Sequence, residues 1–227
     1  RWLADMEEKP AVAVLTGDII EFSAYDETAR RKILSVLQEE AGNIQLRHQK
    51  QAPFPIGLFR GDGWQLVLLE PSIALLAALL IRCALKSNSG AKTRIAIAVG
   101  EADYLPEGST QTGDGEVFRA SGYLLEALPR RINMGFRWPR ANPPALETVI
   151  DAMLRLLDTI TGQWTAKQAR AVYGALQGFR QVDIARSWPP EPITQQAVAQ
   201  HLDSANWPAV AHTLEVFTGT LGKKICI

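Results

Sequence analysis

The chain has 227 residues, 47% of them hydrophobic, and is long enough to bury one large core or two smaller ones. Lysine and arginine balance aspartate and glutamate at 24 each, and the net charge of zero excludes a uniform surface charge that would attract nucleic acid or anionic membranes. Two cysteines and three scattered histidines exclude a disulfide framework and a zinc site of the usual spacing.

The first predicted elements are a strand and a helix. Residues 11–15 form a continuous aliphatic run that is typical of a strand buried on both faces, and the run ends in Thr16-Gly17-Asp18. Ser23 then stands as a helix cap before a helix predicted over residues 25–41. Residues 43–55 are polar and irregular.

The next elements begin with LFRGDGWQLVLLEP, residues 58–71. An Asp-Gly pair between short apolar runs predicts a β-hairpin. A second helix is predicted over residues 72–86, and its apolar run at 73–81 is too short to cross a bilayer, so we expect no membrane partner and a cytoplasmic location. A strand over 93–99, a helix over 116–128 and a half-exposed strand over 132–138 complete this part.

This order of elements predicts the fold class. It contains the β-α-β-β-α-β unit of ferredoxin-like folds, so we expect an α+β domain over residues 1–140 with an antiparallel sheet and helices on one face. In that topology the first strand lies beside the hairpin. Asp18 and Asp62 are therefore expected at the same edge of the sheet.

Two carboxylates at one edge favour a metal site. They repel each other unless a cation lies between them, and Mg²⁺ or Mn²⁺ with water and phosphate oxygens is the usual solution. Such a site suits metal-assisted attack at a nucleotide phosphate. The alternative is that Asp18 and Asp62 each stabilise their own turn and face solvent separately.

The loop at residues 110–115, TQTGDG, precedes a predicted helix. It could hold an anion or the edge of a nucleotide base, which makes Asp114 a candidate nucleotide contact. A flexible glycine-rich turn is the alternative interpretation.

The remaining residues, 141–227, predict an all-helical domain, with helices over 145–160, 165–176, 182–188, 193–205 and 208–217. Residues 178–188 resemble the first helix of a helix-turn-helix, and Thr194 caps the predicted recognition helix. Gln195, Gln196 and Gln200 lie on its outer side, and glutamine suits adenine edges in the major groove of DNA.

Two features favour a simple helical bundle instead. Residues 163–227 carry six lysines and arginines against four acids, which is a weak positive charge for a DNA-binding domain. The turn at 189–193, PPEPI, is longer than the tight turn of the motif and carries an acid.

Three segments, AVLTGDIIEFS, FRGDGWQLVL and RIAIAVGEAD, occur in the order and spacing of the class III nucleotidyl cyclase catalytic domain, which the first part of the chain resembles. Nearly the whole chain is similar to the SatD family of bacterial proteins. That resemblance rests on TGDI, GDGWQLVLLEP, TGDGEVFRASGYLLEAL and WTAKQARAVYGALQGFRQVDIA.

The cyclase resemblance implies a set of site residues. The metal ligands would be Asp18, Asp62 and the carbonyl of Ile19, and the nucleotide phosphates would lie against Ile20, Glu21, Phe22, Ser23 and Gly61. Cyclases also carry an Asn and, four residues later, an Arg on the following helix, where this chain has Phe118 and Gly122. The resemblance therefore implies the cyclase fold without cyclase activity.

We accordingly expect a homodimeric regulatory protein in which a nucleotide- or metal-binding domain is coupled to a DNA-binding helix-turn-helix. The alternative is a divergent cyclase that uses both aspartates and recruits Arg119, Arg130 or Arg131 as the missing cation. A third interpretation is a structural scaffold that binds neither nucleotide nor DNA.

Overall fold

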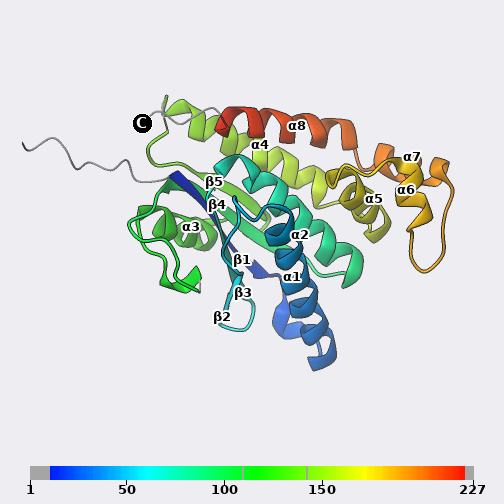
Figure 1. Cartoon of the computed structure of the whole chain (residues 1–227), viewed down its shortest axis with the longest axis horizontal. Helices are drawn as coiled ribbons and strands as arrows, with labels where there is room; N and C mark the ends of the chain where they lie inside the picture. Colours follow the sequence, from blue (N-terminus) through cyan, green and yellow to red (C-terminus); the bar gives the residue numbers. More distant parts are fainter. Residues whose placement is uncertain (1–10, 109, 142, 223–227) are drawn as a thin grey trace, which may run out of the picture.

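A five-stranded sheet lies at the centre of the computed structural model, which describes residues 11–108, 110–141 and 143–222 (Figure 1). Its strands are β1 (Ala11–Ile19), β2 (Gly57–Phe59), β3 (Gly63–Leu68), β4 (Thr93–Glu101) and β5 (Met134–Arg137), in the order β2-β3-β1-β4-β5. The order β2-β3-β1-β4 with antiparallel neighbours is the ferredoxin-like arrangement, and the predicted α+β class is confirmed. The prediction of a wholly antiparallel sheet is wrong, because β5 joins β4 in parallel.

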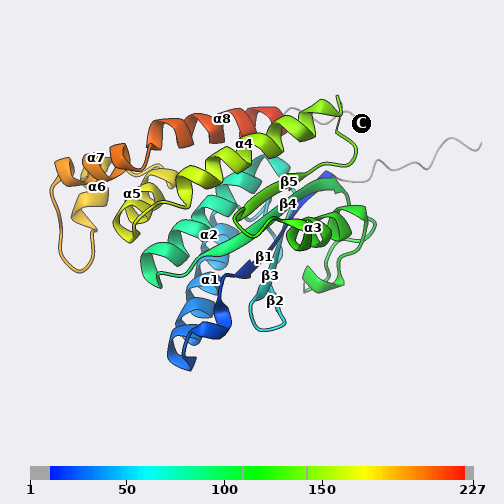
Figure 2. The same cartoon turned by 180° about the vertical axis from the view of Figure 1, so that it is seen from behind.

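Helices cover both faces of the sheet, so the prediction that they lie on one face is wrong (Figures 1 and 2). On one face, α1 (Glu27–Arg47) and α2 (Ala74–Asn88) pack with the side chains of Ala13 and Leu15. On the other, α3 (Glu116–Ala127) packs with Val12 and Val14. Since β1 is aliphatic on both of its sides, both faces of the sheet require a cover.

The strand and helix around Asp18 differ from their predicted bounds. β1 reaches Ile19, so Asp18 belongs to the strand. The first helix is capped by Asp26, whose carboxylate accepts the Ala29 N–H at 2.8 Å, whereas Ser23 lies in a short 3-10 turn, η1 (Phe22–Ala24). The helix continues to Arg47, through residues predicted to be irregular.

The hairpin turn is made by three residues, Arg60, Gly61 and Asp62, and not by the predicted Asp-Gly pair alone. Arg60 and Gly61 have the positive φ angles, 53° and 88°, that a tight hairpin requires. Gly63 already belongs to β3, where a Cβ would lie 2.5 Å from the ring of Phe59. Asp62 is therefore the last residue of the turn, directly before β3.

The apolar segment of the second helix is longer than the sequence run suggested. With the preceding 3-10 turn η2 (Pro71–Ile73), the stretch Pro71–Asn88 is long and apolar enough to cross a bilayer by length and composition. However, 67% of it is buried inside the protein, where it packs between the sheet and the C-terminal helices. That is the pattern of a core helix.

The C-terminal part is helical, with α4 (Ala145–Thr161), α5 (Ala166–Leu176), α6 (Gln181–Arg186), α7 (Gln195–Ser204) and α8 (Trp207–Leu221). The hydrophobic core runs from the sheet into these helices without a break, and Phe217 of α8 packs edge-on against Phe136 of β5 at 5.9 Å. α6 and α7 extend past the end of the sheet (Figure 1). The division at residue 140 stays a prediction.

Candidate functional site

A hollow of about 850 Å³ opens where β1 ends beside the hairpin turn. Its lining includes the predicted site residues Asp18, Ile19, Ile20, Glu21, Phe22, Ser23, Gly61 and Asp62. Four arginines, Arg30, Arg60, Arg94 and Arg130, line the same hollow. The fold thus brings two aspartates and four guanidinium groups to one place.

Strand register sets the two aspartates beside each other. Asp18 lies opposite Gly63 in β3 and opposite Arg94 in β4. The N–H of Ile19 donates to the carbonyl of Asp62 at 3.1 Å, which ties the hairpin turn to the end of β1.

A buried network of packing contacts and hydrogen bonds holds the backbone of Asp18 in place. The indole of Trp64 packs over Gly17, where a Cβ would lie 2.4 Å from the ring. The Trp64 Nε1–H donates to the hydroxyl of Thr93 at 3.0 Å, and that hydroxyl donates to the Asp18 carbonyl at 2.6 Å. Because Trp64 and Thr93 are buried, this support does not depend on solvent.

The carboxylate of Asp18 is bound by Arg94. The Arg94 Nε donates to Oδ1 at 2.9 Å and Nη2 donates to Oδ2, which is the bidentate geometry that guanidinium and carboxylate prefer. The hydrogen bond with Asp18 is the main cause of the raised pKa of Arg94, and the charges of Asp18 and Asp62 raise it further against burial. The cation beside the aspartates is therefore a guanidinium.

This arrangement does not fit a divalent metal. Both oxygens of Asp18 are engaged by Arg94. Among the residues that the structure describes, no group of three or more His, Cys, Asp or Glu side chains could hold a metal ion. Coordination of Mg²⁺ or Mn²⁺ by Asp18, Ile19 and Asp62 stays a prediction, and the metal would have to share the Asp18 carboxylate with Arg94 or displace it.

The backbone at residues 20–23 differs from the expected helix N-terminus. The N–H of Ile20 donates to the Lys92 carbonyl at 2.9 Å, so it is not available to a phosphate. Glu21 adopts a left-handed conformation with φ of 55°. Arg30 holds the turn by donating to the carbonyls of Phe22 (3.1 Å) and Ser23 (2.6 Å).

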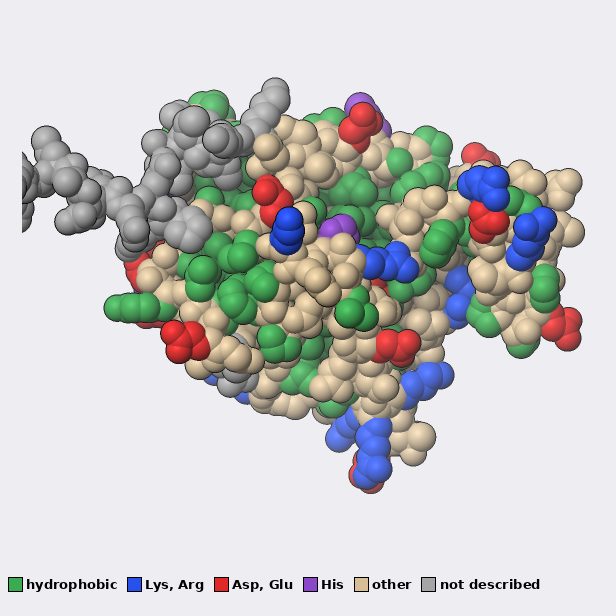
Figure 3. All heavy atoms as spheres, viewed as in Figure 1, with side chains coloured by type: hydrophobic (Ala, Val, Ile, Leu, Met, Phe, Trp, Pro, Cys, Tyr) green, Lys and Arg blue, Asp and Glu red, His purple; other side chains and the backbone are tan. Residues whose placement is uncertain are grey.

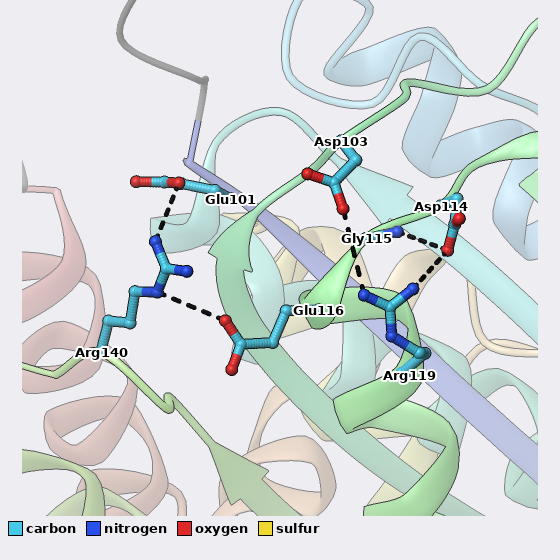
Figure 4. A network of polar contacts seen from close by, with 7 residues as sticks. All are labelled: Glu101, Asp103, Asp114, Gly115, Glu116, Arg119 and Arg140. Atoms are coloured by element: carbon cyan, nitrogen blue, oxygen red, sulfur yellow. Dashed lines mark hydrogen bonds and ion pairs between the residues drawn. The ribbon is translucent and has the colours of Figure 1, made fainter.

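Asp114 lies outside the hollow, in a network at the start of α3 (Figure 4). Its carboxylate accepts from the Gly115 N–H at 2.7 Å and from Arg119 at 2.8 Å. Asp114 thus joins the predicted loop to Arg119 of α3.

In the same network, Arg140 joins Glu101 (3.1 Å) and Glu116 (3.3 Å) (Figure 4). Glu101 is seven residues from Arg94 along β4, about 23 Å at the rise of a strand. The network and the hollow therefore lie at opposite ends of the sheet.

The two positions aligned with the cyclase Asn and Arg provide no polar group. Phe118 is buried against Val12 and Val14. Gly122 borders a smaller hollow of about 340 Å³ that Asp18 and Asp62 also line, and the space beyond its Cα is open. Of the alternative cations, Arg119 is held at the far end of the sheet, and Arg130 lines the main hollow.

α7 has the two faces that the sequence predicts. Thr194 caps it by accepting the Ala197 N–H at 3.1 Å, and Val198 and Leu202 are buried. The side chains of Gln195, Gln196 and Gln200 are exposed. Charges of both signs are mixed over the end of the molecule formed by α6 and α7, whereas lysine and arginine gather where α1 begins (Figure 3). Contact of α7 with DNA stays a prediction.

Sequence reasoning missed Arg94. The aliphatic run of RIAIAVG and the Gly-Glu pair at 100–101 predict a strand and its end, and they assign no role to Arg94. A charged residue at the second position of a buried strand was the available signal, because it must find a partner or solvent. Its partner could be named only once β4 was known to lie opposite β1 in this register.

No protein-family model and no curated protein matches this chain, so neither the SatD family nor the helix-turn-helix gains support from these comparisons. Among solved structures, the guanylyl cyclase Cya2 aligns over 57% of this chain and 75% of its own, with 14% identity and a TM-score of 0.43. This likeness is too weak to carry an argument, and the fold class rests on the sheet order.

Proposed function

We propose that this chain is a SatD-like regulatory protein whose cyclase-like α+β part binds a nucleotide and whose helices α6 and α7 bind DNA. The observation that carries the proposal is the convergence of Arg30, Arg60, Arg94 and Arg130 on the hollow beside the two aspartates. Its volume of about 850 Å³ lies in the usual range for small-molecule sites. Guanidinium groups match phosphate oxygens in geometry and charge.

Regulation is favoured over catalysis because the helix after β4 lacks the groups that a cyclase would use. Phe118 is buried in the core, and Gly122 has no side chain. An enzyme without a cation for the transition state loses several kcal/mol of stabilisation, typically about 3 kcal/mol for one lost donor. Binding without turnover is what the remaining groups support.

A homodimer follows from the same proposal. Helix-turn-helix proteins commonly read two half-sites about one helical turn apart, roughly 34 Å. Sedimentation at tens of micromolar protein is expected to show a dimer. A monomer at every concentration would count against DNA binding through α7.

Thermal unfolding in the presence of each common nucleoside triphosphate tests the nucleotide site. A ligand at ten times its Kd stabilises the folded state by about 1.4 kcal/mol. The double change Arg60→Gln, Arg130→Gln is expected to reduce this shift, whereas the matched change Arg119→Gln, Arg140→Gln at the far end of the sheet leaves it unchanged. Failure of every nucleotide to stabilise the wild type would refute nucleotide binding.

A second candidate is a divergent cyclase, which the position of Arg130 in the hollow with both aspartates favours. Incubation with nucleoside triphosphates and Mn²⁺ would then yield a cyclised product. Product that is lost in Asp62→Ala and retained in Gln195→Ala would support this candidate over the regulatory one.

A further inference from the structure

The aspartates of the hollow already have a cation beside them. Arg94 and Asp18 are cross-strand partners in β4 and β1, so the pairing is built into the sheet register. Both side chains are partly shielded from solvent, at 30% and 21% exposure. A half-shielded, bidentate pair of this kind is stronger than a typical surface ion pair.

Arg94 retains donor capacity that the pair with Asp18 does not use. Its Nε and Nη2 groups are used in the pair, and Nη1 is not. Arg60 and Arg130 line the same hollow, and neither makes a hydrogen bond or an ion pair with another residue in the described parts of the chain. Three arginines thus retain donors for an incoming anion.

We propose that the hollow binds a phosphorylated ligand without a divalent metal, with Arg94 as the cation that takes the metal's place between Asp18 and the phosphate. The proposal rests on the proposed function, since both concern the same hollow. It adds that the bound form of the ligand is the free polyanion and not its magnesium complex.

Electrostatics supports the metal-free form. A phosphate beside Asp18 would be repelled by the carboxylate unless a positive charge lies between them. Arg94 provides that charge, while Arg60 and Arg130 add two more from the hairpin and from the segment after α3. A magnesium ion carried by the ligand would have to compete with Arg94 for Asp18, and it would also meet these other cations.

Calorimetric titration with inorganic triphosphate, in EDTA and in excess MgCl₂, tests this directly on the full chain. We expect binding in EDTA and a lower apparent affinity in excess MgCl₂, because the magnesium ion converts the free triphosphate to its complex. Arg94→Gln combined with Asp18→Asn removes the pair without leaving a lone charge, and it is expected to weaken binding in EDTA at least tenfold. Arg180→Gln with Asp183→Asn removes an exposed Arg–Asp pair at the start of α6 and should leave binding unchanged.

Arg94→Lys sharpens the assignment because it keeps the charge but loses the planar fork. It should bind in EDTA more weakly than the wild type and more tightly than the double variant. Binding of triphosphate by the wild type that appears only with MgCl₂, or that is as tight or tighter in MgCl₂ than in EDTA, would overturn the metal-free site and leave nucleotide binding intact. Absence of binding in both buffers, together with no stabilisation by any nucleotide, would refute both proposals.

Discussion

Carboxylates in the hollow differ in burial and in hydrogen-bond partners from those at the interface between the sheet part and the C-terminal helices. At the interface, Asp158 and Glu40 are each only 4% exposed, and both are hydrogen-bonded within the protein. In the hollow, Asp18 is held by one exchangeable side-chain partner and Asp62 is half-buried. Buried charges need permanent partners because water cannot replace them, whereas half-exposed charges can exchange a partner for a ligand.

The two interface carboxylates, Asp158 and Glu40, accept hydrogen bonds from different kinds of donor. Asp158 accepts from Arg82 of α2 and from the Asn133 N–H, both at 2.7 Å. Glu40 of α1 accepts from the hydroxyl of Tyr173 of α5 at 2.5 Å. Burial raises the pKa of Glu40 to about 7, although hydrogen bonds from Tyr173 and Asn43 lower it in part.

The largest expected effect is the loss of the buried ion pair. Asp158→Ala leaves Arg82 and the Asn133 N–H without their acceptor, and breaking such a pair typically costs about 3–5 kcal/mol. Urea unfolding monitored by circular dichroism measures this change. Asp183→Ala, in the exposed pair with Arg180, is the control and should change stability little. Equal effects of the two changes would remove the distinction between buried and exposed carboxylates.

A pH-dependent stability is the next largest effect. Between pH 4.5 and about 7 the folded state retains a proton on Glu40 that the unfolded state has lost, so the free energy of unfolding falls as pH rises through this window. The pKa difference corresponds to roughly 3–4 kcal/mol. Glu40→Gln should remove the dependence, while Glu39→Gln, at the exposed neighbour, should retain it.

Removal of the hydroxyl oxygen of Tyr173 should change the pKa of Glu40. Tyr173→Phe removes the hydroxyl that favours the ionised form of Glu40, so the pKa of Glu40 should rise above its value of about 7. Carbon-13 NMR of the Glu40 carboxyl measures the shift. A lower pKa in this variant would contradict the assigned role of Tyr173.

Two glycines that line the smaller hollow provide a fourth test. Gly17→Ala places a methyl group 2.4 Å from the Trp64 ring and 2.6 Å from the Arg94 carbonyl, and overpacking of this kind costs about 1–3 kcal/mol. It should also weaken nucleotide binding, because Asp18 and Arg94 move. Gly122 lies within α3, and a Cβ added there would have no neighbouring atom within 4 Å outside the backbone of its own helix. Gly122→Ala should therefore stabilise the protein by about 0.5–1 kcal/mol. Parallel unfolding curves of both variants provide the comparison.

The smallest effect on stability is expected for the unpaired arginines. Arg60→Gln and Arg130→Gln should each leave the unfolding midpoint almost unchanged, because both side chains are exposed and neither is ion-paired within the described residues. Each should weaken triphosphate binding several-fold, and the remaining affinity should depend less on salt. A change in stability without a change in affinity would show that these two arginines stabilise the fold and do not bind the ligand.

The elements that could be predicted are those defined by local pattern. The aliphatic run of β1, the apolar α2 and the Thr194 cap of α7 are all found close to their predicted places. Their boundaries shifted where polar residues continue an element. β1 extends through Asp18 because it is paired on both sides, and α1 extends to Arg47 because Ile44 is buried beneath it.

The sequence by itself determined the succession of strands and helices, because hydrophobic periodicity and turn residues act over short distances. That succession matches the ferredoxin-like unit, which placed Asp18 and Asp62 at one edge. Only the tertiary structure decided which face α3 covers, that the core continues into the C-terminal helices, and that Arg94 holds Asp18. These depend on register and packing between segments far apart in the chain. Asp18 and Arg94 are 76 residues apart in sequence, and no local pattern relates two such positions until β1 and β4 pair.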